Sequence, residues 1–445
     1  MTGHQQVDFG RNKFMGYCYA PFIGTLTDDR QHIKMGGRRY TTSATYHYVL
    51  CGVNLKEKIS EGVRRRKPLK GFVTLPVLLA ERRIIKMKKV AIMTFHAANN
   101  FGAVLQNYAL QKVLKDVFHT EVETIDYHCD AIDGQYGIWQ KKDKLRRHIW
   151  NLINLLPELI RRKFNEFRKK FLLLSKSCSI QDLYKYSEAY DIYICGSDQV
   201  WNKEIIKDNL SAYLLDFVST KPKFAYAASA GNGIIEDELL VSKIKQLNYI
   251  TVRESELKDF LVSKGIECNC VCDPVFLLEK SRWMTILAKQ TKKDYVFLYY
   301  IDSNKELCEA IAKTIASNED KKICCPCKIE KTNLFCKYKS YGAGPAEFLT
   351  DIFYADMIVA SSFHAIAFSI IFEKQFIAVP HNKTGQRVID LLDYLGLSDR
   401  IVTSYRSFEQ KKIKTIDYNS IRNKLTEWRL ESMKDIRKIV DWEEN

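Results

Sequence analysis

Apolar positions along the chain change their spacing repeatedly after Met87. Continuous apolar runs such as Lys89–Phe95 are typical of buried strands, whereas the leucines of Gly102–Val117 recur at helical spacing. The expected strands are Lys89–Phe95, Val122–Tyr127, Asp191–Cys195 and Lys223–Ala228, followed by Tyr249–Val252, Val271–Cys272, Tyr295–Tyr300, Met357–Ala360 and Gln375–Val379. Helical segments separate most of these strands. This alternation predicts an α/β fold in which helices cover parallel sheets.

The strands fall into two series, and the chain is too long for one ordinary core. We therefore expect two Rossmann-like domains that face each other across a cleft. The N-terminal domain is expected over residues 87–275, and the C-terminal domain, with its terminal helices, over residues 276–445. Their junction lies near residues 275–292, where an apolar segment gives way to lysine-rich sequence.

Residues 1–86 differ from the rest of the chain, because they show weak periodicity and several basic clusters, such as Arg64–Lys67. Two interpretations are open. Either the segment is an accessory leader that contacts membrane phosphates or nucleic acid, or Met87 is the true start of the protein. Of the net charge of +16, residues 1–86 carry +10, with 16 Lys and Arg against 6 Asp and Glu, which leaves +6 for the rest. We therefore expect no nucleic-acid partner.

Composition places the chain among globular proteins. Its hydrophobic content of 46% and aromatic content of 12% exclude a disordered or fibrous class. No run of 18 or more apolar residues predicts a membrane span, and no apolar segment near the start predicts a signal peptide. We therefore expect a cytoplasmic protein.

Cysteines are scattered over this large chain, and we expect them to be reduced thiols. The densest group comprises Cys324, Cys325, Cys327 and Cys336. It resembles half of a zinc site, but no second paired group follows at a defined spacing, so free thiols are favoured. A second group, Cys268, Cys270 and Cys272, alternates along a predicted strand and is expected to pack in the core. The sequence therefore predicts no metal site.

Several standard signatures are absent from the sequence. There is no G-x-x-x-x-G-K-[ST] phosphate loop, no G-x-G-x-x-G fingerprint and no G-x-S-x-G elbow. No Asp-x-Asp pair is present to hold a nucleotide sugar through a divalent metal. These absences disfavour a kinase, a dehydrogenase and an esterase.

Five polar motifs instead follow predicted strands or open predicted helices. They are residues 94–106 (TFHAANNFGAVLQ), 195–202 (CGSDQVWN), 251–255 (TVRES) with the later pair Asp273-Pro274, 344–348 (GPAEF) and 361–369 (SSFHAIAFS). The ends of parallel strands form the ligand-binding edge of open α/β sheets. In this order and at these spacings, the motifs resemble the polysaccharide pyruvyl transferase family over residues 87 to about 400.

The resemblance implies a fold similar to the two-domain GT-B glycosyltransferases, with the acceptor on the N-terminal domain and the donor on the C-terminal domain. It also implies transfer of the pyruvyl group of phosphoenolpyruvate to two hydroxyls of one sugar, which leaves a cyclic ketal. Phosphoenolpyruvate would be the co-substrate, with no further cofactor. The acceptor would be a polysaccharide or lipid-linked oligosaccharide precursor of a capsule or another cell-surface polysaccharide.

Two alternatives to pyruvyl transfer are open. The first is a glycosyltransferase of the same architecture that uses a nucleotide sugar as its donor. The second is a non-enzymatic basic protein that binds nucleic acid or membrane through its leader and a basic helix.

His364 is the candidate catalytic residue, because it matches the histidine of an [RS]-x-H-G type motif in the family and titrates close to working pH. The chain departs from this motif twice. Ser362 stands where some family members carry a donor-binding arginine, and Ala365 replaces the glycine. The alternative is that His364 only caps a helix that begins at Ala365.

Donor binding requires cations or oriented backbone N–H groups, since phosphoenolpyruvate carries a carboxylate and a phosphate. Arg253 matches a donor-binding arginine of the family, and a surface ion pair with a neighbouring glutamate is the alternative role for it. Ser362 is the second expected donor-binding position. Lys383 or Arg387 would replace the arginine that is missing there.

The acceptor side is expected to carry amide and carboxylate side chains, namely Asn100, Gln106, Asp198 and Gln199. Each of them could instead cap a helix or a turn. His96 also follows a predicted strand, and we expect it to be a spectator. The basic amphipathic stretch 141–171 either contacts an anionic membrane surface that presents a lipid-linked glycan or covers the core as a solvated helix face.

Overall fold

The computed structural model describes residues 32–35, 38–41, 87–129, 132, 155–231, 235, 237–300, 304–326, 336–340, 342–381, 385–411 and 414–443. The chain divides into two compact units, Met1–Arg83 and Ile84–Asn445. In the first unit, strands β1 (His32–Met35) and β2 (Arg38–Thr41) pair in antiparallel register. The rest of the predicted leader lies outside the described residues.

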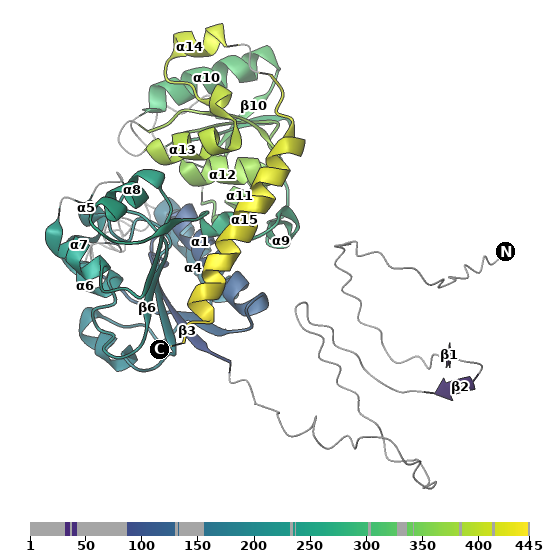
Figure 1. Ribbon diagram of the computed structural model, residues 1–445. Helices are drawn as coiled ribbons and strands as arrows, with labels where there is room; N and C mark the ends of the chain where they lie inside the picture. Colours follow the sequence, from purple (N-terminus) through teal and green to yellow (C-terminus); the bar gives the residue numbers. More distant parts are fainter. Residues whose placement is uncertain are drawn as a thin grey trace. The chain divides into compact units, whose positions relative to one another are not determined.

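The first sheet of the second unit has six parallel strands in the order β4-β3-β5-β6-β7-β8 (Figure 1). Its strands are β3 (Lys89–Met93), β4 (Glu121–Thr124), β5 (Ile192–Cys195), β6 (Lys223–Ala228), β7 (Tyr249–Val252) and β8 (Asn269–Cys270). The sequence predicted β6 and β7 to the residue and placed β3, β4 and β5 with small errors at their ends.

The strand predicted at Val271–Cys272 is wrong, because β8 ends at Cys270. The chain turns soon afterwards: Asp273 accepts a hydrogen bond from the Val275 N–H (3.1 Å) and so caps the 3-10 helix η4 (Pro274–Leu277). A capping aspartate followed by proline ends the extended conformation at this point.

The second sheet has five parallel strands in the order β11-β10-β9-β12-β13. They are β9 (Tyr295–Tyr299), β10 (Lys322–Cys325), β11 (Tyr338–Lys339), β12 (Met357–Ala360) and β13 (Gln375–Ala378). The sequence predicted β9, β12 and β13 but neither β10 nor β11. Two all-parallel sheets confirm the predicted α/β class with two Rossmann-like domains.

The cysteines that resemble half of a zinc site belong to the packing of the second sheet. Cys324 and Cys325 are buried in β10, and Cys336 is buried shortly before β11. Burial raises the pKa of the Cys324 thiol to about 12, which keeps it protonated. Cys327 lies outside the described residues.

The helices of the second unit follow the strands as the alternation predicted. They are α1 (Phe101–Asp116), α4 (Leu155–Phe171), α5 (Lys203–Ile206), α6 (Leu210–Tyr213), α7 (Glu238–Ile244), α8 (Ser255–Ser263), α9 (Lys280–Met284), α10 (Lys305–Asn318), α11 (Pro345–Phe353), α12 (Phe363–Ile371), α13 (Gln386–Leu395), α14 (Tyr405–Gln410) and α15 (Tyr418–Val440), with 3-10 segments at Ile180–Tyr186, Lys207–Asn209 and Ser398–Arg400.

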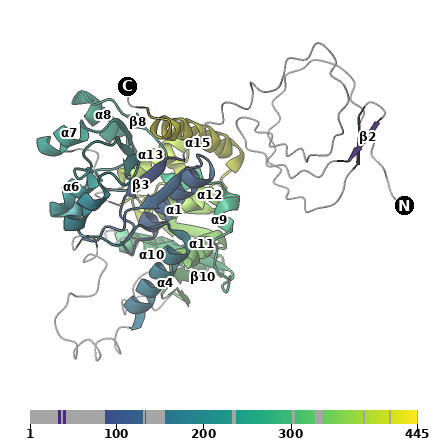
Figure 2. The ribbon, with the colours of Figure 1, turned by 90° about the horizontal axis from the view of Figure 1, so that it is seen from below.

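Helices cover both faces of the first sheet, with α6, α7 and α8 on one side and α1 and α15 on the other (Figures 1 and 2). Successive residues of its strands accordingly enter different cores. Ile194 belongs to a cluster with α1, whereas its neighbour Cys195 belongs to a cluster with α7 and α8. The α1 cluster also includes Phe297 and Ala360 of the second sheet, so the two domains share one hydrophobic core.

The last helix, α15, returns from the second domain to the first sheet (Figure 1). The Cys272 N–H donates to Ser432 Oγ (3.0 Å), and the Tyr249 hydroxyl donates to Asp435 Oδ1 (2.5 Å). The range 276–445 expected for the C-terminal domain therefore includes a helix that packs on both domains.

Within the predicted basic stretch, residues 155–171 form α4, and residues 141–154 lie outside the described part of the chain. Phe164 and Phe167 are buried in the core that the two domains share, whereas Arg161, Arg162, Lys169 and Lys170 are exposed. None of the described helices is both long and apolar enough to cross a lipid bilayer.

Candidate active site

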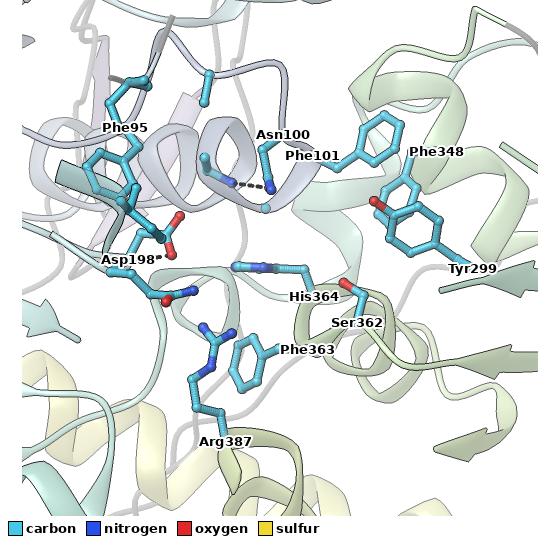
Figure 3. Close-up of a pocket in the computed structure, with 16 residues that line it drawn as sticks. Phe95, Asn100, Phe101, Asp198, Tyr299, Phe348, Ser362, Phe363, His364 and Arg387 are labelled. Atoms are coloured by element: carbon cyan, nitrogen blue, oxygen red, sulfur yellow. Dashed lines mark hydrogen bonds between the residues drawn. The ribbon is translucent and has the colours of Figure 1, made fainter. Parts of the chain in front are cut away.

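A cavity of about 100 Å³ is lined by residues of both domains (Figure 3). The first domain contributes Phe95, Ala98, Asn100, Phe101, Gly102, Ala103, Ile132, Asp198, Gln199 and Ile205. The second domain contributes Tyr299, Phe348, Ser362, Phe363, His364 and Arg387. Most of the polar residues follow the carboxyl ends of strands, where open α/β sheets bind ligands.

His364 lies in the first turn of α12, directly after β12, and its ring is almost fully buried. Its Nε2 atom is 3.6 Å from Oδ2 of Asp273, which is beyond the distance of a hydrogen bond. The helix starts at Phe363 with Ser362 as N-cap, so the alternative that His364 caps a helix beginning at Ala365 is wrong.

Gly102 allows the start of α1 to approach this histidine. A Cβ atom at position 102 would overlap the ring of His364, around its Nδ1 atom. Asn100 is the N-cap of α1, and its side chain accepts a hydrogen bond from the Ala103 N–H (3.2 Å). Sequence reasoning missed the role of Gly102, although a glycine immediately after the first residue of a helix is a signal of close packing.

Arg253 follows β7 and is buried among carboxylates. It donates to Oδ2 of Asp273 (2.7 Å) and to Oε1 of Glu254 (3.2 Å), and its Nη2 atom is 3.9 Å from Oδ1 of Asp198. Burial alone would lower the pKa of Arg253, but the charges of Glu254, Asp273 and Asp198 outweigh burial and raise it. With 3% of its side chain exposed, Arg253 does not form the surface ion pair considered as its alternative role.

Asp273 joins the arginine to the histidine. Its carboxylate is completely buried, which alone would raise its pKa, but His364 and Arg253 outweigh this effect and hold the pKa well below its usual range. Asp273 is therefore a carboxylate at neutral pH. Sequence reasoning noted the Asp273-Pro274 pair but gave it no role, because only the fold brings it beside His364.

Arg387 supplies a second guanidinium near the cavity. Its Cζ atom lies 5.8 Å from the centre of the Phe363 ring, and Cζ of Arg253 lies 5.0 Å from the same ring. Burial and then the charge of Arg253 lower the pKa of Arg387 to about 10, against the opposing effect of the nearby carboxylates. A bound anion would raise this pKa again, which is the electrostatic property of an anion site.

Two buried nitrogen atoms near the cavity, Arg253 Nη2 and His364 Nε2, form no hydrogen bond within the described residues. Burying a donor without a partner is unfavourable by roughly 1–3 kcal/mol. The first backbone N–H groups of α12 are further hydrogen-bond donors near the cavity, because the side chain of the N-cap Ser362 makes no capping hydrogen bond. Helix N-termini of this kind bind anions.

A sequence model of the polysaccharide pyruvyl transferase family matches residues 100–383, more than half of the chain. The chain belongs to the polysaccharide pyruvyl transferase family. Membership makes it a transferase and confirms the resemblance that the five motifs indicated. His364, Asp273 and Arg253 all lie within the matched residues.

Other comparisons add less to this assignment. No curated protein sequence matches the transferase. Similar solved structures include a Listeria monocytogenes protein assigned as a UDP-N-acetylglucosamine 2-epimerase (7% identity, 81% of this chain and 98% of that chain covered, TM-score 0.48) and the UDP-N-acetylglucosamine 2-epimerase of Rickettsia bellii (11%, 80% and 98%, 0.44). A third is the Methanocaldococcus jannaschii UDP-GlcNAc 2-epimerase with UDP-GlcNAc and UDP (13%, 78% and 99%, 0.43).

The donor residues expected for the transferase are placed as follows. Ser362, His364 and Arg387 line the cavity together, whereas Arg253 does not line it and instead contacts Phe363 and Asp273. Lys383 lies outside the described residues. Among the described residues, Arg387 is therefore the cation best placed to replace the arginine that is missing at position 362.

The acceptor residues expected for the transferase divide into two groups. Asn100, Asp198 and Gln199 line the cavity, and Figure 3 shows Asn100 on the far side of His364 from Arg387. Gln106 does not line it: its side chain is fully buried in α1 and donates to Thr94 Oγ1 (2.8 Å) and to the Ala103 carbonyl (2.9 Å). Gln106, six residues after Asn100 in the chain, holds the β3–α1 connection together.

Proposed function

We propose that this transferase moves the pyruvyl group of phosphoenolpyruvate onto two hydroxyls of a sugar, forming a cyclic ketal. The observation that carries the proposal is the cavity wall formed by His364, Arg387 and the N-terminus of α12. Phosphoenolpyruvate has a carboxylate and a phosphate, and a guanidinium and free helix amides are complementary to both groups. Asp198, which lines the same cavity from the first domain, would contact sugar hydroxyls.

The reaction assigns complementary tasks to the two walls. Protonation of the methylene carbon of phosphoenolpyruvate makes C2 electrophilic, and one hydroxyl adds to C2 as it loses its proton. The bond from C2 to the phosphate oxygen then breaks, and the second hydroxyl adds to C2. The first hydroxyl proton offsets the one delivered to carbon, and the second leaves with the phosphate. His364 would act as the acid and Asp198 as the base.

The acceptor in this proposal is a polysaccharide or lipid-linked oligosaccharide precursor at the cytoplasmic face of the membrane. Exposed cations of α4 support peripheral contact with anionic lipids: Lys169 and Lys170 are exposed, as are Arg161 and Arg162, which pair with Glu158 and Glu166 of the same helix. Phe164 and Phe167 point into the core, so such contact would be electrostatic rather than an insertion of the apolar face.

Calorimetric titration with phosphoenolpyruvate and with a panel of nucleotide sugars tests the proposal. Arg387→Gln removes the cation that lines the cavity, and Arg406→Gln is the control, because Arg406 is exposed on α14 and does not line the cavity. We expect phosphoenolpyruvate to bind saturably and about 10- to 100-fold more weakly to Arg387→Gln alone. Binding of a nucleotide sugar without binding of phosphoenolpyruvate would contradict the proposal.

A further inference from the structure

A second group of titratable side chains lies at the carboxyl ends of β3 and β4, outside the residues that line the cavity. It comprises His96, Asp126 and His128. Nε2 of His96 is 2.7 Å and Nε2 of His128 is 3.2 Å from the same carboxylate oxygen, Oδ1 of Asp126. One ligand atom from each residue lies within 4.8 Å of the other two. Two imidazole nitrogens and a carboxylate oxygen thus converge on one point.

The hydrogen bonds of His96 leave a conflict at this point. Its Nδ1 atom lies 3.2 Å from the Thr94 carbonyl oxygen and its Nε2 atom lies 2.7 Å from Oδ1 of Asp126, and both of these oxygens only accept hydrogen bonds. A neutral imidazole has a single N–H, so one of its two nitrogens faces an acceptor with a lone pair of its own. A cation bound between Nε2 and the carboxylate would remove this repulsion.

The arrangement around His96 is typical of metal-binding histidines. Such histidines donate the other ring N–H to a carbonyl or a carboxylate, which fixes the ring and its tautomer. His96 makes this contact with Thr94 and has 1% of its side chain exposed. The ring therefore points its second nitrogen at Asp126 in a fixed direction.

Backbone contacts hold both segments that carry the three side chains. Arg168 of α4 donates to the carbonyls of His96 (2.8 Å) and of Ala97 and Ala98 (2.7 Å each). On the other segment, the Cys178 N–H donates to the Asp126 carbonyl (2.9 Å), and the His128 N–H donates to the Cys178 carbonyl (3.0 Å). A site with this support is organised before a ligand arrives.

We propose that His96, Asp126 and His128 bind a divalent transition-metal ion of the zinc class. Imidazole nitrogens select such ions over Mg²⁺ and Ca²⁺, which prefer oxygen ligands. Because 44% of the His128 side chain is exposed, the ion would keep at least one position open to water. It would also clamp the loop that runs from His96 to Asn100 at the cavity wall.

The proposal is tested by equilibrium dialysis of the full-length, chelator-treated protein against Zn²⁺. His128→Asn is the first variant, since His128 lies at the exposed rim and its loss spares the core, and His96→Gln is the second. His119→Asn is the matched control: His119 is an exposed histidine with a backbone φ of 54°, which asparagine accommodates. Co²⁺ replaces Zn²⁺ in a parallel measurement, because its absorption spectrum reveals sulfur ligands.

We expect a binding event in the wild type and in His119→Asn that weakens at least about tenfold in both cluster variants, with no sulfur signature for Co²⁺. Zinc binding that is the same in all four proteins would overturn the proposal, as would no binding to the wild type. A sulfur signature for the ion that the variants lose would also overturn it. Thermal unfolding of each variant separates loss of the site from loss of the fold.

Discussion

Two histidine–aspartate pairs lie at strand ends of this transferase, and their neighbours give them different properties. His364 faces Asp273 at 3.6 Å, and Asp273 is fully buried and bound to Arg253. His96 faces Asp126 at 2.7 Å, and Asp126 is partly exposed and contacts a second histidine. Within the described residues, Nε2 of His364 makes no hydrogen bond, whereas both ring nitrogens of His96 lie close to oxygen atoms. The first pair leaves a ring nitrogen available to a substrate, and the second converges with His128 on the proposed metal site.

Replacing each histidine with glutamine should give the largest difference between the pairs, measured as the loss of kcat/KM. We expect His364→Gln to lower kcat/KM for pyruvyl transfer by about 10²–10⁴, the usual contribution of a general acid or base. His96→Gln should cost far less, because His96 does not line the cavity. Initial rates with phosphoenolpyruvate and an accepted glycan measure both. Equal losses in the two variants would remove the distinction between the pairs.

Replacing each aspartate with asparagine should lower the free energy of unfolding by different amounts in the two pairs. Asp273→Asn leaves Arg253 buried with one carboxylate partner fewer, and breaking a buried ion pair costs about 3–5 kcal/mol of unfolding free energy. Asp126→Asn should cost about 1.5–3 kcal/mol, because its contacts are charge-assisted hydrogen bonds near solvent. Urea unfolding of both variants gives the comparison. A smaller cost for Asp273→Asn than for Asp126→Asn would contradict this ranking.

Gly102→Ala tests the close packing that is found at His364. Alanine normally stabilises a helix by about 0.5–1 kcal/mol relative to glycine, but here its methyl group would overlap the histidine ring. We expect kcat/KM to fall by about 100-fold, as misplacement of a catalytic group by about 1 Å does. If the variant were fully active and more stable, His364 would not need this approach. Circular dichroism confirms that α1 still forms.

Acid titration should give the smallest effect, a pH-dependent loss of unfolding free energy. The pKa of Asp273 is lower in the folded protein than its unfolded value of about 3.9, so its stabilising contribution is complete above that pH. The contribution is lost as the pH falls through the folded pKa. Between about pH 5 and pH 2, the wild type should lose up to about 1.4 kcal/mol per pH unit more than Asp273→Asn does. Urea unfolding at several pH values measures this, and parallel curves would refute it.

Local sequence was sufficient for most of the fold. Strands β6, β7 and β12 were predicted to the residue, because each is a short apolar run that parallel packing buries on both faces. Strand β10 was missed since two of its four residues are cysteines, which suggested a metal site. Strand β11 has only two residues and exists through its pairing with β10, which no local pattern shows.

The sequence predicted site residues correctly where the residue stands in a motif close to the end of a predicted strand. His364 and Asp198 stand directly after strands, and both line the cavity. Asp273 and Gly102 belong to the site because they lie beside His364. They precede His364 by 91 and 262 residues in the chain, so no local pattern links them to it. Gln106 shares a motif with Asn100, but helix geometry turns it into the core.

The path of α15 has a consequence for the order in which the protein folds during synthesis. The first sheet is complete in sequence at Cys270, yet the Cys272 N–H finds its partner at Ser432, 160 residues later. The ring of Phe224 likewise packs against the ring of Trp442, with 5.4 Å between their centres, and Lys88 donates to the Trp442 carbonyl (2.7 Å). The first domain therefore emerges from the ribosome with part of one face uncovered beside α1, and α15, which is made later, covers it.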